Sequence, residues 1–385
     1  MIDMGQGLKN RGYSRDDVDE RRKAVEDFSS ARLDSVAGYT IEPEGAKSNI
    51  ENMIGCTQIP LGYVGPVMVN GEYAEGEFLV PMATTEGALI ASVNRGCSLL
   101  NSGGGANVRV IGDNMTRAPV FRVDGVIHAM DVIDWIGENI ESLKDAAEST
   151  TRRGKLLGIE AFPNGRNLFL RFSYHTADAM GMNMCTIATE AASRVIEENT
   201  GAVMISVSGN MCTDKKPAAM NMISGRGKTV IADCIIPGAE IEERTKASVD
   251  SIVETNYRKN LVGSAMAGAL GQNAHVANML AAMYIATGQD PAQVVEGSMT
   301  STLCEKVDDD LYISVRIPAL EVGSVGGGTK LPTQSEALDI MDCRGEGKAL
   351  KLAEIMAVAV LAGELSTLGA QSAGHLGKAH AELGR

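Results

Sequence analysis

The hydrophobic and polar positions of the chain change their spacing several times, and each change marks a different predicted element. Residues 15–28 are polar with helical spacing, and Ser14 before them, followed by acidic residues in the first turn, predicts an N-capped helix. Residues 62–82 alternate between apolar and polar positions around an Asn-Gly pair, which is typical of a β-hairpin. We therefore expect a helical N-terminal segment over 1–39, followed by a domain that contains strands.

The centre of the chain predicts a complete small domain. Its elements follow in the order strand, helix, strand, strand, helix, strand, which is the order of ferredoxin-like folds. The predicted strands are 119–126, 154–162, 167–174 and 202–209, and the predicted helices are 129–150 and 182–199. We expect an inserted domain over 118–207 within a large domain made of 40–117 and 208–385. The expected fold class is α+β, a large helix-rich α/β domain with a small ferredoxin-like insertion.

The second half of the chain should supply the core helices of the large domain. Residues 264–286 and 348–371 are almost continuously apolar, so we expect two long helices that are buried on all sides. His275 falls inside the first of these helices and is expected to be a structural polar group. Asp290 before Pro291 predicts a helix N-cap with proline at the first helical position.

Composition favours a folded globular chain and argues against several partners. The chain has 385 residues, 44% of them hydrophobic, and its 35 Lys and Arg against 49 Asp and Glu give a net charge of −14. With only six Phe, eight Tyr and one Trp, it lacks the basic surface and stacking rings of nucleic-acid-binding proteins. We identify neither a signal peptide nor an apolar run of about 18 residues, so we expect a cytoplasmic protein without a membrane partner. The seven scattered cysteines form no CxxC pair, and we expect neither disulfides nor a metal.

Common catalytic fingerprints are absent. Neither GxGxxG, a P-loop, HExxH nor GxSxG occurs in the sequence. Residues 208–221, SGNMCTDKKPAAMN, instead place two adjacent lysines between a Gly-Asn turn and Pro-Ala-Ala. An adjacent lysine pair most often marks a solvated surface, but these flanking residues favour a shaped loop.

Three other segments could take part in binding or catalysis, and each also has a purely structural interpretation. Thr84 or Thr85 is placed to cap a helix with Glu86 in its first turn, where the acid could simply complement the helix dipole. The glycines of 323–329 could cradle a phosphate or form a flexible turn. Residues 178–184 open a predicted helix whose N-terminus favours a pyrophosphate, although a methionine-rich core stripe is the alternative.

Between about residues 40 and 380, nine segments in matching order and spacing resemble 3-hydroxy-3-methylglutaryl-CoA (HMG-CoA) reductases. They include VPMATTEGALIASVNRGC, DAMGMN, VSGNMCTDKKPAAMN, EVGSVGGGT and AGHLGKAH. DAMGMN and the length of the insertion resemble the first class of this family, found in eukaryotes and archaea, without the membrane-anchoring region of the animal enzymes. The resemblance implies reduction of HMG-CoA to mevalonate and CoA with two NADPH, in isoprenoid biosynthesis.

The resemblance also implies a role for individual residues. The four catalytic positions are Glu86, Lys215, Asp290 and His380. The positions that hold the hydroxymethylglutaryl end are Arg117, Ser208, Asp214, Lys216, Lys259 and Asn278, and those on the CoA side are Ser92, Asn94 and Arg95. The positions for the nicotinamide nucleotide are Asp178, Met180, Gly181, Asn183, Gly326, Gly327 and Gly328, with Thr151 and Arg152 at the 2′-phosphate.

The implied chemistry explains why such residue types are needed. Each of two hydride transfers places negative charge on a former carbonyl oxygen, which a fixed cation such as Lys215 stabilises by roughly 3–4 kcal/mol in a dry site. Glu86 and Asp290 would keep the lysine charged, and a buried Glu86 would give the aldehyde oxygen its proton. His380 would protonate the departing CoA thiolate, and on spacing alone His375 suits the same role.

The resemblance implies a homodimer, possibly a tetramer, with shared active sites. The lysine segment of one chain would complete a site formed by Glu86 and Asp290 of its neighbour. Three other functions compete with the reductase: the same fold oxidising mevalonate with NAD, an ATP-dependent kinase using residues 323–329, and a CoA-binding protein without catalysis. The kinase lacks a carboxylate and Ser/Thr set with the spacing of a magnesium site.

Overall fold

The computed structural model describes residues 12–374, so the two candidate catalytic histidines near the C-terminus, His375 and His380, lie outside the described residues. The strands are β1 (Leu61–Asn70), β2 (Glu75–Ala83), β3 (Ala106–Arg117), β4 (Val120–Arg122), β5 (Lys155–Asn164), β6 (Asn167–His175), β7 (Val203–Ser206), β8 (Gly227–Ile236), β9 (Ser301–Val307) and β10 (Asp310–Leu320). This mixture of helix and sheet confirms the α+β class.

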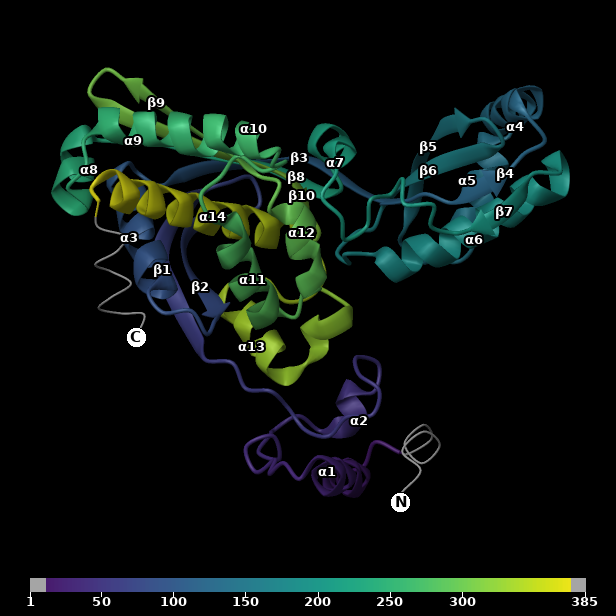
Figure 1. Cartoon of the computed structure of the whole chain (residues 1–385), viewed down its shortest axis with the longest axis horizontal. Helices are drawn as coiled ribbons and strands as arrows, with labels where there is room; N and C mark the ends of the chain where they lie inside the picture. Colours follow the sequence, from purple (N-terminus) through teal and green to yellow (C-terminus); the bar gives the residue numbers. More distant parts are fainter. Residues whose placement is uncertain (1–11, 375–385) are drawn as a thin grey trace.

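The helices fall into three groups, which Figure 1 shows as separate regions. In the N-terminal segment they are α1 (Arg15–Ser29) and α2 (Pro43–Ala46), and beside β4–β7 they are α4 (Val126–Glu138), α5 (Ile140–Glu148) and α6 (Met182–Thr200). The others are α3 (Leu89–Ser102), α7 (Ala219–Ser224), α8 (Gly238–Thr245), α9 (Val249–Thr255), the π-helix η1 (Asn256–Gly263), α10 (Ser264–Ala267), α11 (Val276–Thr287), the 3₁₀ turn η2 (Pro291–Gln293), α12 (Val294–Gly297), the 3₁₀ turn η3 (Gly327–Lys330), α13 (Pro332–Ile340) and α14 (Ala349–Ser372). We call β4–β7 with α4–α6 the small unit, and the elements in this last group, with their strands, the large unit.

Strand β3 joins the sheets of the two units. Its first part pairs with β8 over Asn107–Asn114, and its last three residues, Met115–Arg117, pair with β6 of the small unit. In the small unit the strand order is β5-β6-β4-β7 with every neighbour antiparallel, which is the order of a ferredoxin-like sheet. The two units therefore join at β3, which contributes to both sheets (Figure 1).

Helix α14 is the centre of the large unit. Most of its residues are fully buried, in contact with α3, α11 and strands β8 and β10. It is the one helix among residues 12–374 that is long and apolar enough to cross a membrane, although we expected no such segment. All of its most apolar window is buried inside the protein, and a core helix passes the same test of length and composition.

Several predicted elements are confirmed. Ser14 caps α1 in a capping box with Asp17, since each side chain accepts the other residue's backbone N–H. The hairpin β1–β2 and the core helix α14 lie where the apolar pattern placed them. The predicted helix 129–150 is present as α4 and α5, which are separated at Asn139.

The prediction of one continuous helix over 264–286 is wrong. Helix α10 ends at Gly268, whose φ of 69° is left-handed, and α11 begins only after His275. Between them Gln272 exchanges backbone hydrogen bonds with Thr300 and Thr302, so the sheet edge, and not a helix, satisfies this backbone. His275 is therefore the N-cap residue of α11 and not a residue inside a helix.

Candidate active site

The two lysines lie in an irregular loop between β7 and α7. We call residues 208–218 the lysine loop. Its backbone contains Asn210, Thr213 and Lys215 in the left-handed region, with φ of 65°, 56° and 57°. Three such non-glycine residues in one loop indicate a conformation that the surrounding structure imposes. The prediction of a shaped loop instead of a solvated helix face is confirmed.

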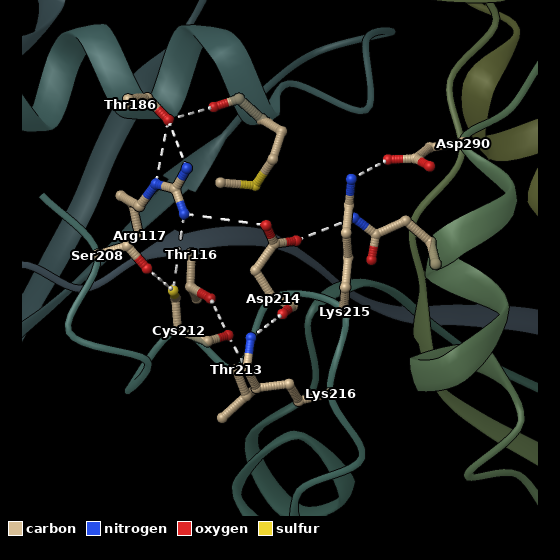
Figure 2. A network of polar contacts seen from close by, with 12 residues as sticks. Thr116, Arg117, Thr186, Ser208, Cys212, Thr213, Asp214, Lys215, Lys216 and Asp290 are labelled. Atoms are coloured by element: carbon tan, nitrogen blue, oxygen red, sulfur yellow. Dashed lines mark hydrogen bonds and ion pairs between the residues drawn. The ribbon is translucent and has the colours of Figure 1, made fainter.

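Lys215 points at Asp290. Its Nζ lies 2.8 Å from Asp290 Oδ2 (Figure 2). Asp290 also caps η2, because its side chain accepts the N–H of Ala292 at 3.1 Å, as the Asp-Pro pair predicts. The ion pair forms within one chain. Because the structure holds a single chain, the expected contact between Lys215 and Asp290 of a neighbouring chain stays a prediction.

Asp214 is held from three sides. Its Oδ1 lies 3.1 Å from Arg226 Nη2 and accepts a hydrogen bond from Gln293 Nε2 at 3.0 Å. Its Oδ2 lies 3.9 Å from Arg117 Nη1 (Figure 2). Burial opposes ionisation of this carboxyl group, but Arg226, Gln293 and the neighbouring cations outweigh it and hold its pKa below the usual range. Asp214 is therefore a fixed anion directly before Lys215.

Arg117 connects the lysine loop to helix α6. Its Nε and Nη2 donate to Thr186 Oγ1 at 3.0 and 2.8 Å, and its Nη1 lies 3.8 Å from Cys212 Sγ. Ser208 Oγ lies 3.6 Å from the same sulfur. Burial opposes ionisation of the Cys212 thiol, but the backbone N–H of Asp214, the Ser208 hydroxyl and the Arg117 guanidinium together lower its pKa. Arg117, Ser208 and Asp214, three of the predicted substrate residues, thus form one network (Figure 2).

Sequence reasoning missed a set of buried charges beneath this network. Arg226, Glu296 and Glu321 have no exposed side-chain surface, and Arg226 Nη1 lies 2.8 Å from Glu296 Oε1 and 3.3 Å from Glu321 Oε1. Glu296 and Glu321 each stand alone in a mostly apolar or glycine-rich stretch, and Arg226 lies in the glycine-rich segment SGRGKT with Lys228 close by. A charged residue within such a stretch could have indicated a buried ion pair, because a buried charge requires a partner.

Glu86 and Asn278 form a second group. Asn278 Nδ2 lies 3.4 Å from Glu86 Oε1, and 3.3 Å from His275 Nδ1. Glu86 is not in the first turn of a helix: α3 begins at Leu89, and Thr84 accepts the N–H of Glu86 in the preceding turn. Glu86 is also exposed in the single chain, which contradicts the expected burial. Among the described contacts, none joins this group to Lys215.

Lys259 lies in the π-helix η1 and is half-buried. Its Nζ donates to Asn260 Oδ1 at 2.8 Å. Burial lowers the pKa of Lys259. Such π-helical turns are rare and occur often at functional sites. Lys216 is exposed, and its Nζ donates to the backbone oxygen of Asp214 at 3.1 Å.

The three residues predicted for CoA have protein partners in the single chain. Arg95 donates to the hydroxyl and the carbonyl of Ser366 on α14 at 3.0 and 2.8 Å, and Ser92 Oγ lies 3.0 Å from the same hydroxyl. Asn94 Oδ1 accepts the backbone N–H of Gly65 at 2.7 Å. These contacts fix α3 against α14 and β1.

A cavity of about 260 Å³ lies on the predicted cofactor side. It is lined by Thr151, Arg152, Arg153, Gly154, Thr176, Ala177, Asp178, Ala179, Gly181, Met184, Val325 and Glu346. Four of the residues predicted for the nucleotide therefore meet at one cavity. Met180, Asn183 and the three glycines do not line it, although Gly326, with φ of 82°, directly follows Val325.

Asp178 links the cavity to the core helix. Its carboxylate accepts the backbone N–H groups of Gly347 and Ala349 at 2.8 and 3.2 Å, at the start of α14. Its backbone oxygen accepts the N–H of Ser324. The segment that begins α6 and the glycine loop (residues 323–329) are thereby fixed side by side. Among residues 12–374 we find no cluster of three or more His, Cys, Asp or Glu placed to bind a metal.

Comparison with known proteins gives one consistent result. The family model described as hydroxymethylglutaryl-coenzyme A reductase matches residues 17–385. The chain is 55% identical to the 3-hydroxy-3-methylglutaryl-coenzyme A reductase of Haloferax volcanii, over 96% of this chain and 93% of that protein. It is 54% identical to that of Methanocaldococcus jannaschii, over 95% of this chain and 92% of that protein.

The fold comparison agrees with the sequence comparison. The class II reductase of Streptococcus pneumoniae, solved bound to NADPH, matches 95% of this chain and 99% of that chain with a TM-score of 0.70 and 19% identity. At this identity the likeness supports the fold alone. The family model and the archaeal relatives each cover nearly the whole chain. The chain therefore belongs to the hydroxymethylglutaryl-coenzyme A reductase family.

Proposed function

We propose that this chain reduces HMG-CoA to mevalonate and CoA with two molecules of NADPH, with Lys215 as the group that stabilises negative charge on the reacting oxygen. Membership of the reductase family supports the reaction. The observation that supports the role of Lys215 is its ion pair with Asp290 at 2.8 Å, in a loop whose backbone is held in a left-handed conformation.

The chemistry requires a cation that is fixed before the substrate binds. When a hydride adds to the thioester or to the aldehyde, the carbonyl oxygen becomes an alkoxide. Lys215 donates a hydrogen bond to that oxygen, and the ion pair with Asp290 holds the ammonium group in place. Glu86 donates the proton that the aldehyde oxygen takes up, and His380 protonates the CoA thiolate that leaves between the two reductions.

The remaining predicted residues bind the two ends of the substrate. Arg117, Ser208, Asp214, Lys216, Lys259 and Asn278 are proposed to hold the hydroxymethylglutaryl group, whose free carboxylate suits the exposed ammonium of Lys216. Ser92, Asn94 and Arg95 are proposed for CoA. Their contacts with Ser366 and Gly65 would then have to be shared with, or exchanged for, contacts with CoA.

NADPH is the proposed hydride donor. The cavity beside Thr151 and Arg152 suits its phosphates, because two arginines line the wall and the N-terminus of α6 begins at Gly181. Asp178, Met180, Asn183 and the glycine loop are proposed to hold the rest of the nucleotide. High identity to archaeal relatives, with only 19% identity to a class II enzyme, supports placing the chain in the first class.

We further propose a cytoplasmic homodimer in which Glu86 of one chain approaches Lys215 of the other. Glu86 is exposed and lacks a described contact with Lys215 in the single chain, and the exposed apolar side chains of Ile223 and Met266 suit a buried interface. All seven cysteines are free thiols, which suits a reducing compartment. A monomer that stays fully active on dilution would contradict the shared site.

The test of the function is the stoichiometry of the reaction. The protein is mixed with HMG-CoA and NADPH, and the nicotinamide absorbance is followed together with release of free CoA thiol. We expect two NADPH consumed for each CoA released, with mevalonate as product. Turnover only in the reverse direction, with mevalonate, CoA and NAD, would favour the mevalonate-oxidising alternative. Binding of CoA without any turnover would favour the non-enzyme.

A further inference from the structure

Glu296 uses both of its oxygens beneath the lysine loop. It lies in α12, is fully buried, and its Oε1 accepts the backbone N–H of Lys215 at 2.5 Å and a hydrogen bond from Arg226 Nη1 at 2.8 Å. Its Oε2 accepts a hydrogen bond from Asn221 Nδ2 at 2.6 Å. The buried Glu296 carboxylate thus binds the backbone of Lys215, a proposed catalytic residue, and the side chains of Arg226 and Asn221.

Glu296 and Asp290 hold Lys215 at its two ends. They lie six positions apart, flanking η2 and the start of α12. Asp290 binds the ammonium group of Lys215, and Glu296 binds the main-chain N–H of the same residue. Because one short helical segment carries both acids, the direction of the lysine side chain is fixed relative to that segment.

Arg226 connects Glu296 to the other parts of the proposed site. Its guanidinium is fully buried, and it contacts Asp214 of the lysine loop, Glu321 at the end of β10 and the sulfur of Met182 at the start of α6. Glu321 lies two residues before the glycine loop, and Met182 directly follows Gly181 of the cofactor cavity. One side chain thus touches the lysine loop, the start of α6 and the residue two positions before the glycine loop.

The charges indicate that stability alone does not explain the cluster. Burial and the nearby Glu296 carboxylate raise the pKa of Glu321 well above its usual range, so the folded protein favours the protonated form of this acid. Arg226 Nε and Glu321 Oε2 are buried without a hydrogen-bond partner. Apolar side chains of similar volume often serve stability as well as a buried ion pair does. What they cannot do is accept the N–H of Lys215.

We propose that Glu296, braced by Arg226, is a positioning residue that holds Lys215 where it meets the reacting oxygen. This proposal rests on the proposed role of Lys215 in HMG-CoA reduction. It predicts that loss of the Glu296 contact lowers turnover while substrate binding and the fold are largely retained, because a small displacement of a catalytic group is enough to lose rate.

The experiment compares Glu296→Met with Glu354→Met in the full chain, because a methionine of similar volume cannot accept the backbone N–H groups that these carboxylates accept. Glu354 is a matched control: it is fully buried and accepts the backbone N–H groups of Glu72, Tyr73 and Ala74 at 3.1, 2.8 and 2.7 Å, in the turn of the β1–β2 hairpin. For Glu296→Met we expect kcat to fall about tenfold or more with KM for HMG-CoA within about threefold of wild type. For Glu354→Met we expect a loss of thermal stability comparable to that of Glu296→Met and a kcat close to wild type.

Three outcomes would overturn the proposal. One is a folded Glu296→Met protein with wild-type kcat, and another is an equal loss of kcat in both variants. The third applies if Glu296→Met does not fold: Asn221→Ala, which removes one contact of the same carboxylate and no charge, then takes its place, and an unchanged kcat contradicts the proposal. Wild-type protein that does not oxidise NADPH with HMG-CoA would instead contradict the proposed function.

Discussion

The molecule contains two arginine–glutamate pairs near the proposed active site, and they differ in almost every physical respect. Arg226 and Glu296 lie 2.8 Å apart with no exposed side-chain surface on either partner. Arg153 and Glu346 also lie 2.8 Å apart, but at the cofactor cavity, with 59% and 67% of their side chains exposed. Separation alone therefore says little about what an ion pair does.

Burial decides the difference. Breaking a buried pair by removing one partner leaves an uncompensated charge and costs about 3–5 kcal/mol, whereas an exposed pair contributes roughly 0–1 kcal/mol. The lysine loop is thus held by contacts that are costly to break. The cofactor cavity is bordered by a contact that an incoming phosphate can replace, and this contrast suits a site with a fixed catalytic cation and an exchangeable nucleotide.

The strongest test of the fixed side is Lys215→Met. Removing the cation should leave the fold intact and lower kcat by a factor of about a hundred or more, because one oxyanion donor is worth roughly 2.7–4 kcal/mol. Steady-state NADPH oxidation measures the effect. Lys306→Met, which removes an exposed lysine paired with Asp250 on the far strand β9, is the control and should keep wild-type turnover. A loss below about tenfold in Lys215→Met would contradict the charge-stabilising role.

The exchangeable side is tested by Arg152→Ala. If Arg152 contacts the 2′-phosphate, its removal should raise KM for NADPH about tenfold, the value of one hydrogen bond to a charged group. KM for NADH should stay unchanged, since NADH lacks that phosphate, so the same variant supplies its own control. Equal increases for both nucleotides would show that Arg152 acts on the fold of the cavity and not on nucleotide choice.

Much of the fold follows from the sequence because most elements carry a local signal. The capping box at Ser14, the Asn-Gly hairpin and the largely apolar α14 are each determined by neighbouring residues. The prediction of one continuous helix over 264–286 was wrong because a distant segment decides the structure there. The apolar pattern is real, but Gly268 ends the helix and the edge strand β9 captures the backbone of Gln272, and that partner lies about thirty residues away.

The site divides in the same way. The lysine loop can be predicted from the sequence because a Gly-Asn turn and a proline flank the two lysines. Asp290 can be predicted as a helix cap because a proline follows it. Arg226, Glu296 and Glu321 come from three distant segments, and their pairing depends on β8, α12 and β10 packing together. The spacing of these residues in the sequence does not predict that they pair, because only the folded chain brings the three elements together.

The buried side can be examined by titration with Glu321→Gln. The folded protein raises the pKa of this acid above the ordinary value of 4.5, so folding favours the protonated form. The stability that the protonated acid contributes is complete below the unfolded pKa and is lost as pH rises toward the folded one. Glutamine does not ionise, so the variant should unfold at a higher temperature than wild type at about pH 8, with the difference shrinking toward about pH 4. Parallel curves across this range would contradict a raised pKa of Glu321 in the folded protein.

The smallest effect is expected for the exposed pair. In Glu346→Gln, Arg153 loses its carboxylate partner but keeps its place at the cavity wall, so an incoming phosphate no longer competes with an acid for the guanidinium. Because an exposed pair is worth at most about 1 kcal/mol, we expect KM for NADPH to fall by roughly two- to fivefold, with kcat and thermal stability unchanged. The gain should disappear at high salt, which screens both contacts. A rise in KM for NADPH would mean that Glu346 orients Arg153 for the nucleotide, and the cofactor side would then be held as firmly as the lysine loop.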